Sequence, residues 1–102
     1  MTGKQRAYLR GLANGIEAKY QIGKGGIDDQ TVRMIDLALE ARELIKVKVL
    51  ENSFLDVREA CGEICERTGA EPVQCIGSKF VLYKRNETDP KIELPTNKKK
   101  KK

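Results

Sequence analysis

Histidine and tryptophan are absent from the 102-residue chain, and cysteine, aromatic residues and long apolar runs are scarce. Without histidine the chain lacks the commonest general base and a common metal ligand, which disfavours catalysis. No apolar run approaches the roughly 20 residues of a membrane-spanning helix, and the chain begins without a signal-peptide core. We therefore expect one non-catalytic domain with a modest hydrophobic core, located in the cytoplasm and without a membrane partner.

The three cysteines form neither a disulfide framework nor a zinc-binding pattern. Cys61, Cys65 and Cys75 include no C-x2-C pair, and no histidine is present to complete a set of four ligands. Cys61 falls on the apolar stripe of an expected helix, where a thiol behaves as a small hydrophobe. We expect all three thiols to be reduced and to pack in the core, with no metal and no cofactor bound.

The net charge of +5 is equal to the charge of five consecutive lysines at residues 98–102. Removing these five from the 20 basic residues leaves 15, which balances the 15 acidic residues. The charges are segregated, because residues 1–27 and 72–85 sum to +4 and +3, whereas residues 28–45 and 53–71 each sum to −3. This segregation predicts one basic face and one acidic face. Random scatter in a short chain is the alternative.

Hydrophobic periodicity predicts an α/β fold with the element order α-β-α-β-α-β-β. Capping signatures begin the helices, with Thr2 and Gln5 before the first, Asp28 before the second, and Ser53 with Asp56 before a third that carries Phe54. The first strand, second helix and second strand have the lengths of a βαβ unit with parallel strands. The expected strands cover residues 20–22, 44–50, 73–76 and 79–83, and the expected second helix covers residues 29–42.

A glycine-rich loop separates the first expected strand from the second expected helix, and it leaves backbone N–H groups free to meet an anion. Its residues are Gly23, Lys24, Gly25 and Gly26. The G-x-x-G spacing matches neither the GxxxxGK[ST] phosphate loop nor the GxGxxG dinucleotide loop. From the motif alone, a loop that binds a nucleic-acid backbone and a turn that needs glycine only for its φ angles are about equally supported. Asp28 and Asp29 oppose a phosphate on the helix axis, so we expect phosphate contacts on the loop itself.

Further basic residues fall on the outer side of the first helix and on one side of the second strand. Arg6 and Arg10 lie one helical turn apart, and Lys46 and Lys48 alternate with apolar residues. Spacing alone leaves open whether these side chains form a solvated face or contact phosphates. The candidate nucleic-acid contacts outside the loop are Lys4, Arg6, Arg10, Lys19, Lys46, Lys48 and Lys84. Because aromatic residues are few, we expect recognition of RNA backbone and shape rather than base stacking.

Several short segments at matching separations resemble the bacterial YhbY-like proteins, whose fold is the CRM (chloroplast RNA splicing and ribosome maturation) domain. The resemblance covers nearly the whole body of the chain and is far more specific than the glycine loop alone. The segments are Lys4-Gln5-Arg6, Leu9-Arg10, Gln21 to Gly26, Glu43 to Val47, Gly69-Ala70-Glu71, Ile76-Gly77, Val81 to Lys84 and Pro90 to Pro95.

The resemblance implies a CRM domain over residues 1–95, with a four-stranded mixed sheet, three helices and a KH-like GxxG loop at residues 23–26. It implies a small RNA-binding protein that joins precursors of the large ribosomal subunit and contacts ribosomal RNA. We also expect a monomer with ribosomal proteins as neighbours. The chain departs from the family in its charge-neutral body and in its terminal lysines, which we expect to form a disordered tail at residues 96–102. A non-catalytic protein–protein adaptor that docks through its acidic helical face is the alternative.

Overall fold

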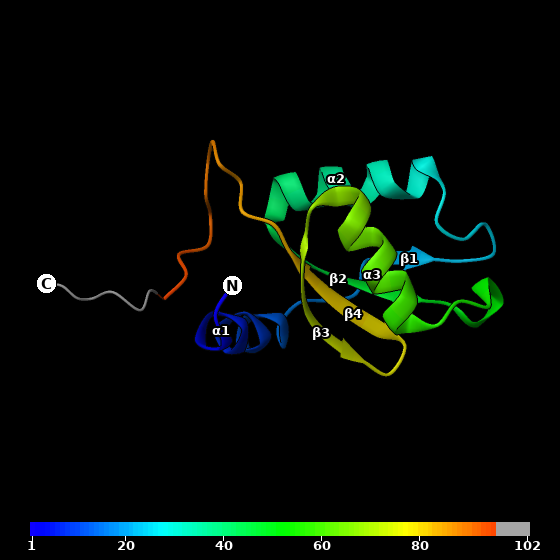
Figure 1. Cartoon of the computed structure of the whole chain (residues 1–102), viewed down its shortest axis with the longest axis horizontal. Helices are drawn as coiled ribbons and strands as arrows, with labels where there is room; N and C mark the ends of the chain where they lie inside the picture. The colour runs from blue at the N-terminus through cyan, green and yellow to red at the C-terminus, as the bar shows by residue number, and fades with distance from the viewer. Residues whose placement is uncertain (96–102) are drawn as a thin grey trace, which may run out of the picture.

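Three α-helices, four strands and one short 3₁₀ helix make up residues 1–95, the range that this computed structural model describes. They are α1 (Gly3–Ala13), β1 (Tyr20–Ile22), α2 (Asp29–Arg42), β2 (Leu44–Val49), η1 (Glu51–Ser53), α3 (Val57–Thr68), β3 (Glu71–Ile76) and β4 (Lys79–Tyr83). The strands form one mixed sheet in the order β1-β2-β4-β3 (Figure 1). β1 and β2 are parallel, as the βαβ pattern predicted, and β4 runs antiparallel to both β2 and β3. The predicted fold class is confirmed.

Side-chain caps fix where the first two helices begin, as the sequence predicted. At α1, Thr2 Oγ1 accepts from Gln5 N at 3.1 Å, and Gln5 Oε1 accepts from Thr2 N at 3.0 Å. This capping box satisfies two N–H groups reciprocally. At α2, the carboxylate of Asp28 accepts from Thr31 N at 2.8 Å. The glycine loop therefore ends at a defined helix start.

The third helix begins later than predicted, and Phe54 lies outside it. The segment around Ser53 forms η1 instead, and Asp56 caps α3 by accepting two backbone N–H groups of its first turn at 3.1 Å each. Because Asp56 satisfies both donors, the helix starts at Val57 rather than near Ser53. Phe54 is consequently 93% exposed instead of buried on the helix.

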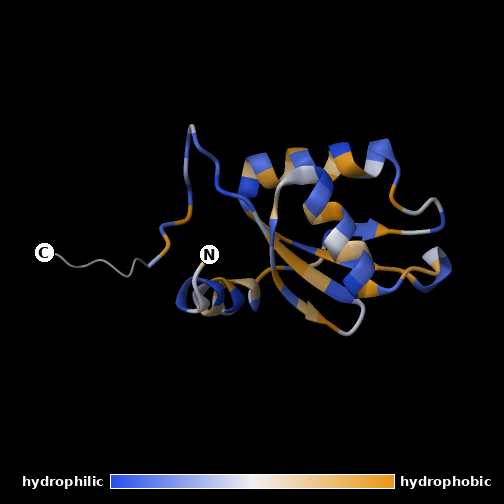
Figure 2. Ribbon diagram, in the orientation of Figure 1, coloured by the Kyte–Doolittle hydropathy of each residue, from blue (hydrophilic) through white to orange (hydrophobic). Residues whose placement is uncertain are grey.

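Each face of the sheet has its own core. On one face, α2 and α3 bury Ile35 and Ile64 against β2 and β4, and in Figure 2 the ribbon of α2 alternates between hydrophilic and hydrophobic colours as expected for a helix with one buried side. On the other face, α1 packs Leu9 and Ala13 against the sheet. The buried stripe of α1 is narrow, since Leu12, three residues after Leu9, is 39% exposed. A single short helix leaves part of this second face uncovered.

A buried carboxylate, that of Glu43, binds the C-terminal segment to the sheet. Glu43 is 0% exposed. Its Oε2 accepts from Asn86 N at 2.7 Å, and its Oε1 accepts from Lys91 N at 2.9 Å and from Ile92 N at 2.7 Å. Burial acts to raise the pKa of this carboxyl, but the three backbone donors together hold it below its usual value. The carboxylate is therefore charged in the folded protein.

Glu43 also makes the turn between α2 and β2. Its φ of 67° lies in the left-handed region that side-chain-bearing residues rarely adopt. Its N–H donates to Leu39 O at 2.7 Å, and its carbonyl accepts from Lys84 N at 2.9 Å. Residues 89–94 lie along the sheet as a strap, with Ile92 and Leu94 packed against its α1 side. The lysine tail predicted at residues 96–102 lies outside the described residues.

Glutamine at position 43 should destabilise the fold, because one carboxylate oxygen becomes an NH₂ donor that faces a backbone N–H. We expect Glu43→Gln to lower the free energy of unfolding by about 2 kcal/mol in urea denaturation. Hydrogen exchange at the amides of Asn86, Lys91 and Ile92 should accelerate. Leu37→Gln, at a side chain that is 59% exposed on α2, is the control and should change neither quantity. Unchanged stability and exchange in Glu43→Gln would contradict this role.

The same carboxylate should make the fold less stable in acid. Since its pKa is lower in the folded than in the unfolded chain, its contribution is complete above the unfolded value of about 4.3 and is lost as the pH falls through the folded value. We expect the free energy of unfolding to decline below about pH 4 and to decline less steeply in Glu43→Gln. Asp28, whose pKa is also lowered, titrates in both the wild type and Glu43→Gln, so it does not contribute to the difference between their slopes. Identical slopes would mean that Glu43 does not contribute.

Candidate nucleic-acid interface

The glycine loop is a tight turn at the end of β1. Gly26 N–H donates to Gly23 O at 2.8 Å, which puts Lys24 and Gly25 at the tip. Over residues 1–95, neither tip residue donates a backbone hydrogen bond, and the Lys24 side chain is exposed. A Cβ added at Gly25 would have its nearest neighbour, Asp28 Oδ2, 4.0 Å away, so another backbone can approach closely. The tip thus presents two N–H groups and one ammonium group to a ligand.

The loop is held from both sides. Gly26 has a φ of 69°, and its carbonyl oxygen lies 3.3 Å from the Thr31 hydroxyl oxygen in the first turn of α2. On the other side, a Cβ added at Gly23 would lie 3.4 Å from Leu50 Cδ1, in the segment that follows β2. Gly23 and Gly26 therefore shape the turn and contact neighbouring segments, whereas Lys24 and Gly25 remain open to a ligand.

The two acids at the start of α2 are engaged by protein groups. Asp28 Oδ1 accepts the backbone N–H of Thr31 and also its hydroxyl at 2.9 Å. These bonds, led by the backbone N–H, lower the pKa of Asp28. Asp29 Oδ1 lies 2.8 Å from Arg67 Nη2 on α3, so its charge is paired with that cation. Both arrangements reduce the repulsion that these acids would exert on an anion at the loop.

A lysine row, formed by Lys46 and Lys48 of β2 and Lys79 of β4, lies on the part of the sheet that α1 leaves uncovered, beside the loop. The strand register pairs Gln21 of β1 with Lys48 of β2, and Lys48 with Lys79 of β4. Paired residues stand on the same face of a sheet. The alternating residues of β2 are buried against α2 and α3, so Lys46 and Lys48 project from the opposite face. Gln21, the partner of Lys48 on β1, lies two residues before the glycine loop. The lysine row and the loop are therefore continuous on the surface.

Lys48 and Lys79 are directly opposed like charges, an arrangement that destabilises a sheet. The ion pairs found within residues 1–95 involve the cations of Arg67, Lys84 and Lys91, and none includes Lys46, Lys48 or Lys79. The sequence did not single out Lys79 as a site residue. A hairpin turn at Gly77-Ser78 was predictable, but the pairing of β4 with β2, which brings Lys79 to Lys48, was not.

The cations of α1 lie on the same side of the sheet as the lysine row, because α1 packs on that face. Lys4 and Arg10 are exposed, and Arg6 Nε donates to Pro72 O at 3.3 Å. Lys19 is exposed immediately before β1. The structure thus brings the predicted cations of the first helix and second strand to one side.

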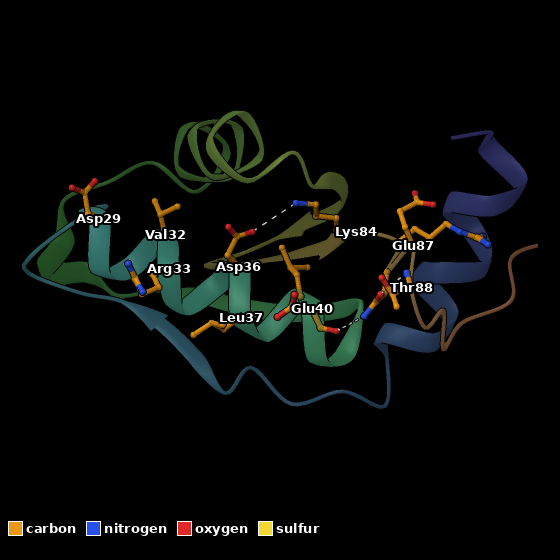
Figure 3. Close-up of a pocket in the computed structure, with 12 residues that line it drawn as sticks. Asp29, Val32, Arg33, Asp36, Leu37, Glu40, Lys84, Glu87 and Thr88 are labelled. Atoms are coloured by element: carbon orange, nitrogen blue, oxygen red, sulfur yellow. Dashed lines mark hydrogen bonds and ion pairs between the residues drawn. The ribbon is translucent and has the colours of Figure 1, made fainter.

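Lys84 differs from the other predicted site residues. Its Nζ donates to Thr68 O at 2.6 Å and lies 3.8 Å from Asp36 Oδ1, so it faces α2 and α3. Figure 3 shows Lys84 pointing toward Asp36 across a groove of about 810 Å³ between α2 and residues 84–88. The groove mixes Asp36, Glu40 and Glu87 with basic residues. Its carboxylates make it a poor surface for a polyanion.

The three thiols pack in or against the core, as predicted. Cys61 is buried, and Cys65 and Cys75 pack against the same cluster. A hydrogen bond with Cys65, together with burial, raises the pKa of Cys61. In the described part of the chain, no group of three or more candidate ligands could hold a metal ion. Within the same 95 residues, no helix is long and apolar enough to cross a membrane.

Known proteins with similar sequences share most of their length with this chain. The family model of the CRS1/YhbY (CRM) domain matches residues 1–84. A Bacillus subtilis protein named "Probable RNA-binding protein YqeI" is 42% identical over 95 residues, which cover 93% of this chain and 99% of the relative. A Haemophilus influenzae protein named "RNA-binding protein" is 35% identical over 95 residues, which cover 93% of this chain and 95% of the relative.

A solved structure also has this fold. The solution structure of the hypothetical protein SAV1595 from Staphylococcus aureus superposes with a TM-score of 0.78 and 49% sequence identity, covering 93% of this chain and 99% of that one. The resemblance first seen in the glycine loop and its flanking segments is confirmed by these matches. The chain belongs to the CRS1/YhbY (CRM) domain family.

Proposed function

We propose that the chain binds RNA, and that its ligand is ribosomal RNA in precursors of the large ribosomal subunit. The names of the Bacillus and Haemophilus relatives support RNA as the ligand class. The observation that carries the proposal is the continuity of the Gly23–Gly26 loop with the unpaired lysine row on the sheet. The ribosomal assignment rests on the family resemblance. We further propose a monomeric, cytoplasmic protein with ribosomal proteins as neighbours.

The surface is suited to phosphates more than to base edges. The N–H groups of Lys24 and Gly25 donate no hydrogen bond within residues 1–95, and a phosphate oxygen can accept from them. Lys46, Lys48 and Lys79 extend the positive charge across the sheet. Contacts of this kind position an RNA and supply salt-dependent affinity, while carrying little sequence information.

We propose a role without catalysis. The carboxylates with shifted pKa values already have structural partners: Asp28 caps α2 and Glu43 binds the C-terminal segment. Neither carboxylate lies free in a cleft, as a general acid or base would. Protonation of these two carboxylates should therefore change the free energy of unfolding rather than the rate of a reaction.

Acidic residues at the loop tip should weaken RNA binding without unfolding the protein. We expect Lys24→Asp with Gly25→Asp to lower affinity for folded ribosomal RNA by about tenfold or more at 0.1 M salt, and to reduce the slope of log K against log salt by about one. Filter binding or fluorescence anisotropy would measure both quantities. Arg33→Asp with Thr88→Asp adds the same charge at the groove between α2 and residues 84–88 and should have a much smaller effect. Equal losses in both double variants would contradict a specific role of the loop.

Replacing Lys48 by glutamate should separate stability from binding. Lys48→Glu turns a like-charge cross-strand pair with Lys79 into an opposite-charge pair, which we expect to stabilise the sheet by about 0.2–1 kcal/mol. RNA affinity should fall at the same time. Thermal melting and anisotropy on one preparation would test this, and a variant that kept full affinity would remove the lysine row from the interface.

The ribosomal assignment is tested by sedimentation of cell lysate through a sucrose gradient. The wild type should migrate with particles slightly lighter than the mature large subunit and be released by ribonuclease. The Lys24→Asp with Gly25→Asp variant should remain at the top, whereas a chain lacking residues 98–102 should still co-migrate. Co-migration that survives ribonuclease would favour a protein–protein adaptor instead, and free migration of the wild type would discard the ribosomal role.

A further inference from the structure

Phe54 is an exposed aromatic ring on an ordered turn. It is 93% exposed, the highest value among the large apolar side chains, and the next highest is 59% for Leu37. Its N–H donates to Glu51 O at 3.1 Å, which closes η1. The neighbouring Ser53 hydroxyl donates to Leu50 O at 2.7 Å and accepts from Leu55 N at 3.2 Å. The ring is therefore held outward by a hydrogen-bonded segment.

The fold itself gives no reason for phenylalanine at this position. Phe54 has φ 60° and ψ 22°, a left-handed conformation that glycine or asparagine adopts with less strain. Leu55 and Val57 supply the apolar contacts that the segment makes with the core. Packing within residues 1–95 therefore explains neither the left-handed backbone nor the 93% exposure of the ring.

Phe54 stands at the same end of the sheet as the glycine loop. Leu50 N donates to Ile22 O at 2.9 Å, and the Cβ position of Gly23 lies 3.7 Å from Asn52 Oδ1 as well as close to Leu50. Figure 1 shows the loop after β1 and the η1 segment side by side at the end of the sheet that is remote from both termini. One ligand can therefore contact both.

We propose that an unpaired base of the RNA stacks on Phe54 while the adjoining phosphate binds the Gly23–Gly26 loop. The inference rests on the proposed function and adds a ligand class: RNA with a loop or bulge rather than a continuous duplex. An aromatic face accepts any base, because every base has a π-face. The exposed acids Glu51 and Asp56, three residues before and two residues after Phe54, disfavour a phosphate on this turn, so the ring receives the base and the loop receives the backbone.

A protein partner is the less favoured occupant of the ring. A protein interface has a continuous apolar patch at its centre. The residues that flank Phe54 on its turn, Glu51, Asn52 and Asp56, are exposed and polar. A single ring surrounded by polar groups fits one base better than an apolar surface of a folded protein.

The test uses the full chain and two RNAs of equal length, a perfect duplex and a stem–loop with 2-aminopurine at an unpaired position. Phe54→Asn removes the ring and keeps the left-handed turn, Phe54→Tyr keeps the ring, and Leu37→Gln removes an exposed apolar side chain elsewhere. We expect Phe54→Asn to lower stem–loop affinity about tenfold and to abolish the 2-aminopurine quenching. Duplex affinity and the melting temperature should not fall, and the Tyr and Leu37 variants should bind as the wild type does.

The outcomes separate this inference from the proposed function. If Phe54→Asn leaves stem–loop affinity and quenching unchanged, or weakens duplex and stem–loop binding equally, stacking on Phe54 is wrong and backbone binding by the loop still stands. If the wild type binds neither RNA at matched salt, the proposed function fails and this inference fails with it. Loss restricted to the stem–loop in Phe54→Asn, with retention in Phe54→Tyr, supports the inference.

Discussion

The buried carboxylate of Glu43 is the constraint that couples the C-terminal segment to the turn between α2 and β2. It lies where α2 ends, where β2 begins and beside the exit of β4, and its two oxygens satisfy three backbone N–H groups of the C-terminal segment. A buried charge without these donors would be strongly unfavourable. Within residues 1–95, these three N–H groups donate to no other acceptor. The carboxylate and the segment therefore depend on each other.

This arrangement divides the sheet into a structural end at Glu43 and a proposed binding end at the glycine loop. α2 runs from the glycine loop at its start to Glu43 at its end, and β2 runs from Glu43 back to the segment beside the loop. The position of the loop relative to Lys46 and Lys48 therefore follows from the βαβ unit that Glu43 closes. Rigid elements hold binding groups more accurately than free loops do.

Features at the binding end are unfavourable for the isolated fold. Lys48 and Lys79 repel each other, and Phe54 combines a left-handed backbone with a solvated ring. At each position another residue would fit the isolated fold better: an acid opposite a lysine in the cross-strand pair, and asparagine at position 54. Their concentration beside the glycine loop is what would be expected of a surface selected for an anionic, partly unpaired ligand.

The features that the sequence could predict are local ones. The Thr2–Gln5 capping box, the Asp28 cap and the period of β2 each depend on residues a few positions apart, and all three are confirmed. Long-range features escaped prediction, because Glu43 binds residues 43 to 49 positions away and Lys79 meets Lys48 only through the sheet order. Phe54 was misassigned because Ser53 and Asp56 offered two competing helix starts, and Asp56 satisfied more donors.

The most direct test is chemical-shift mapping of the ¹⁵N-labelled protein titrated with a ribosomal stem–loop RNA. If RNA lies on the proposed surface, the largest changes will fall on Lys24, Gly25, Lys48, Phe54 and Lys79, with little change at the strap amides that bind Glu43. Changes centred on Asp36, Glu40 and Lys84, in the groove on the other side of the molecule, would contradict the assignment. In that case the acidic face would be the docking surface and the glycine loop a structural turn.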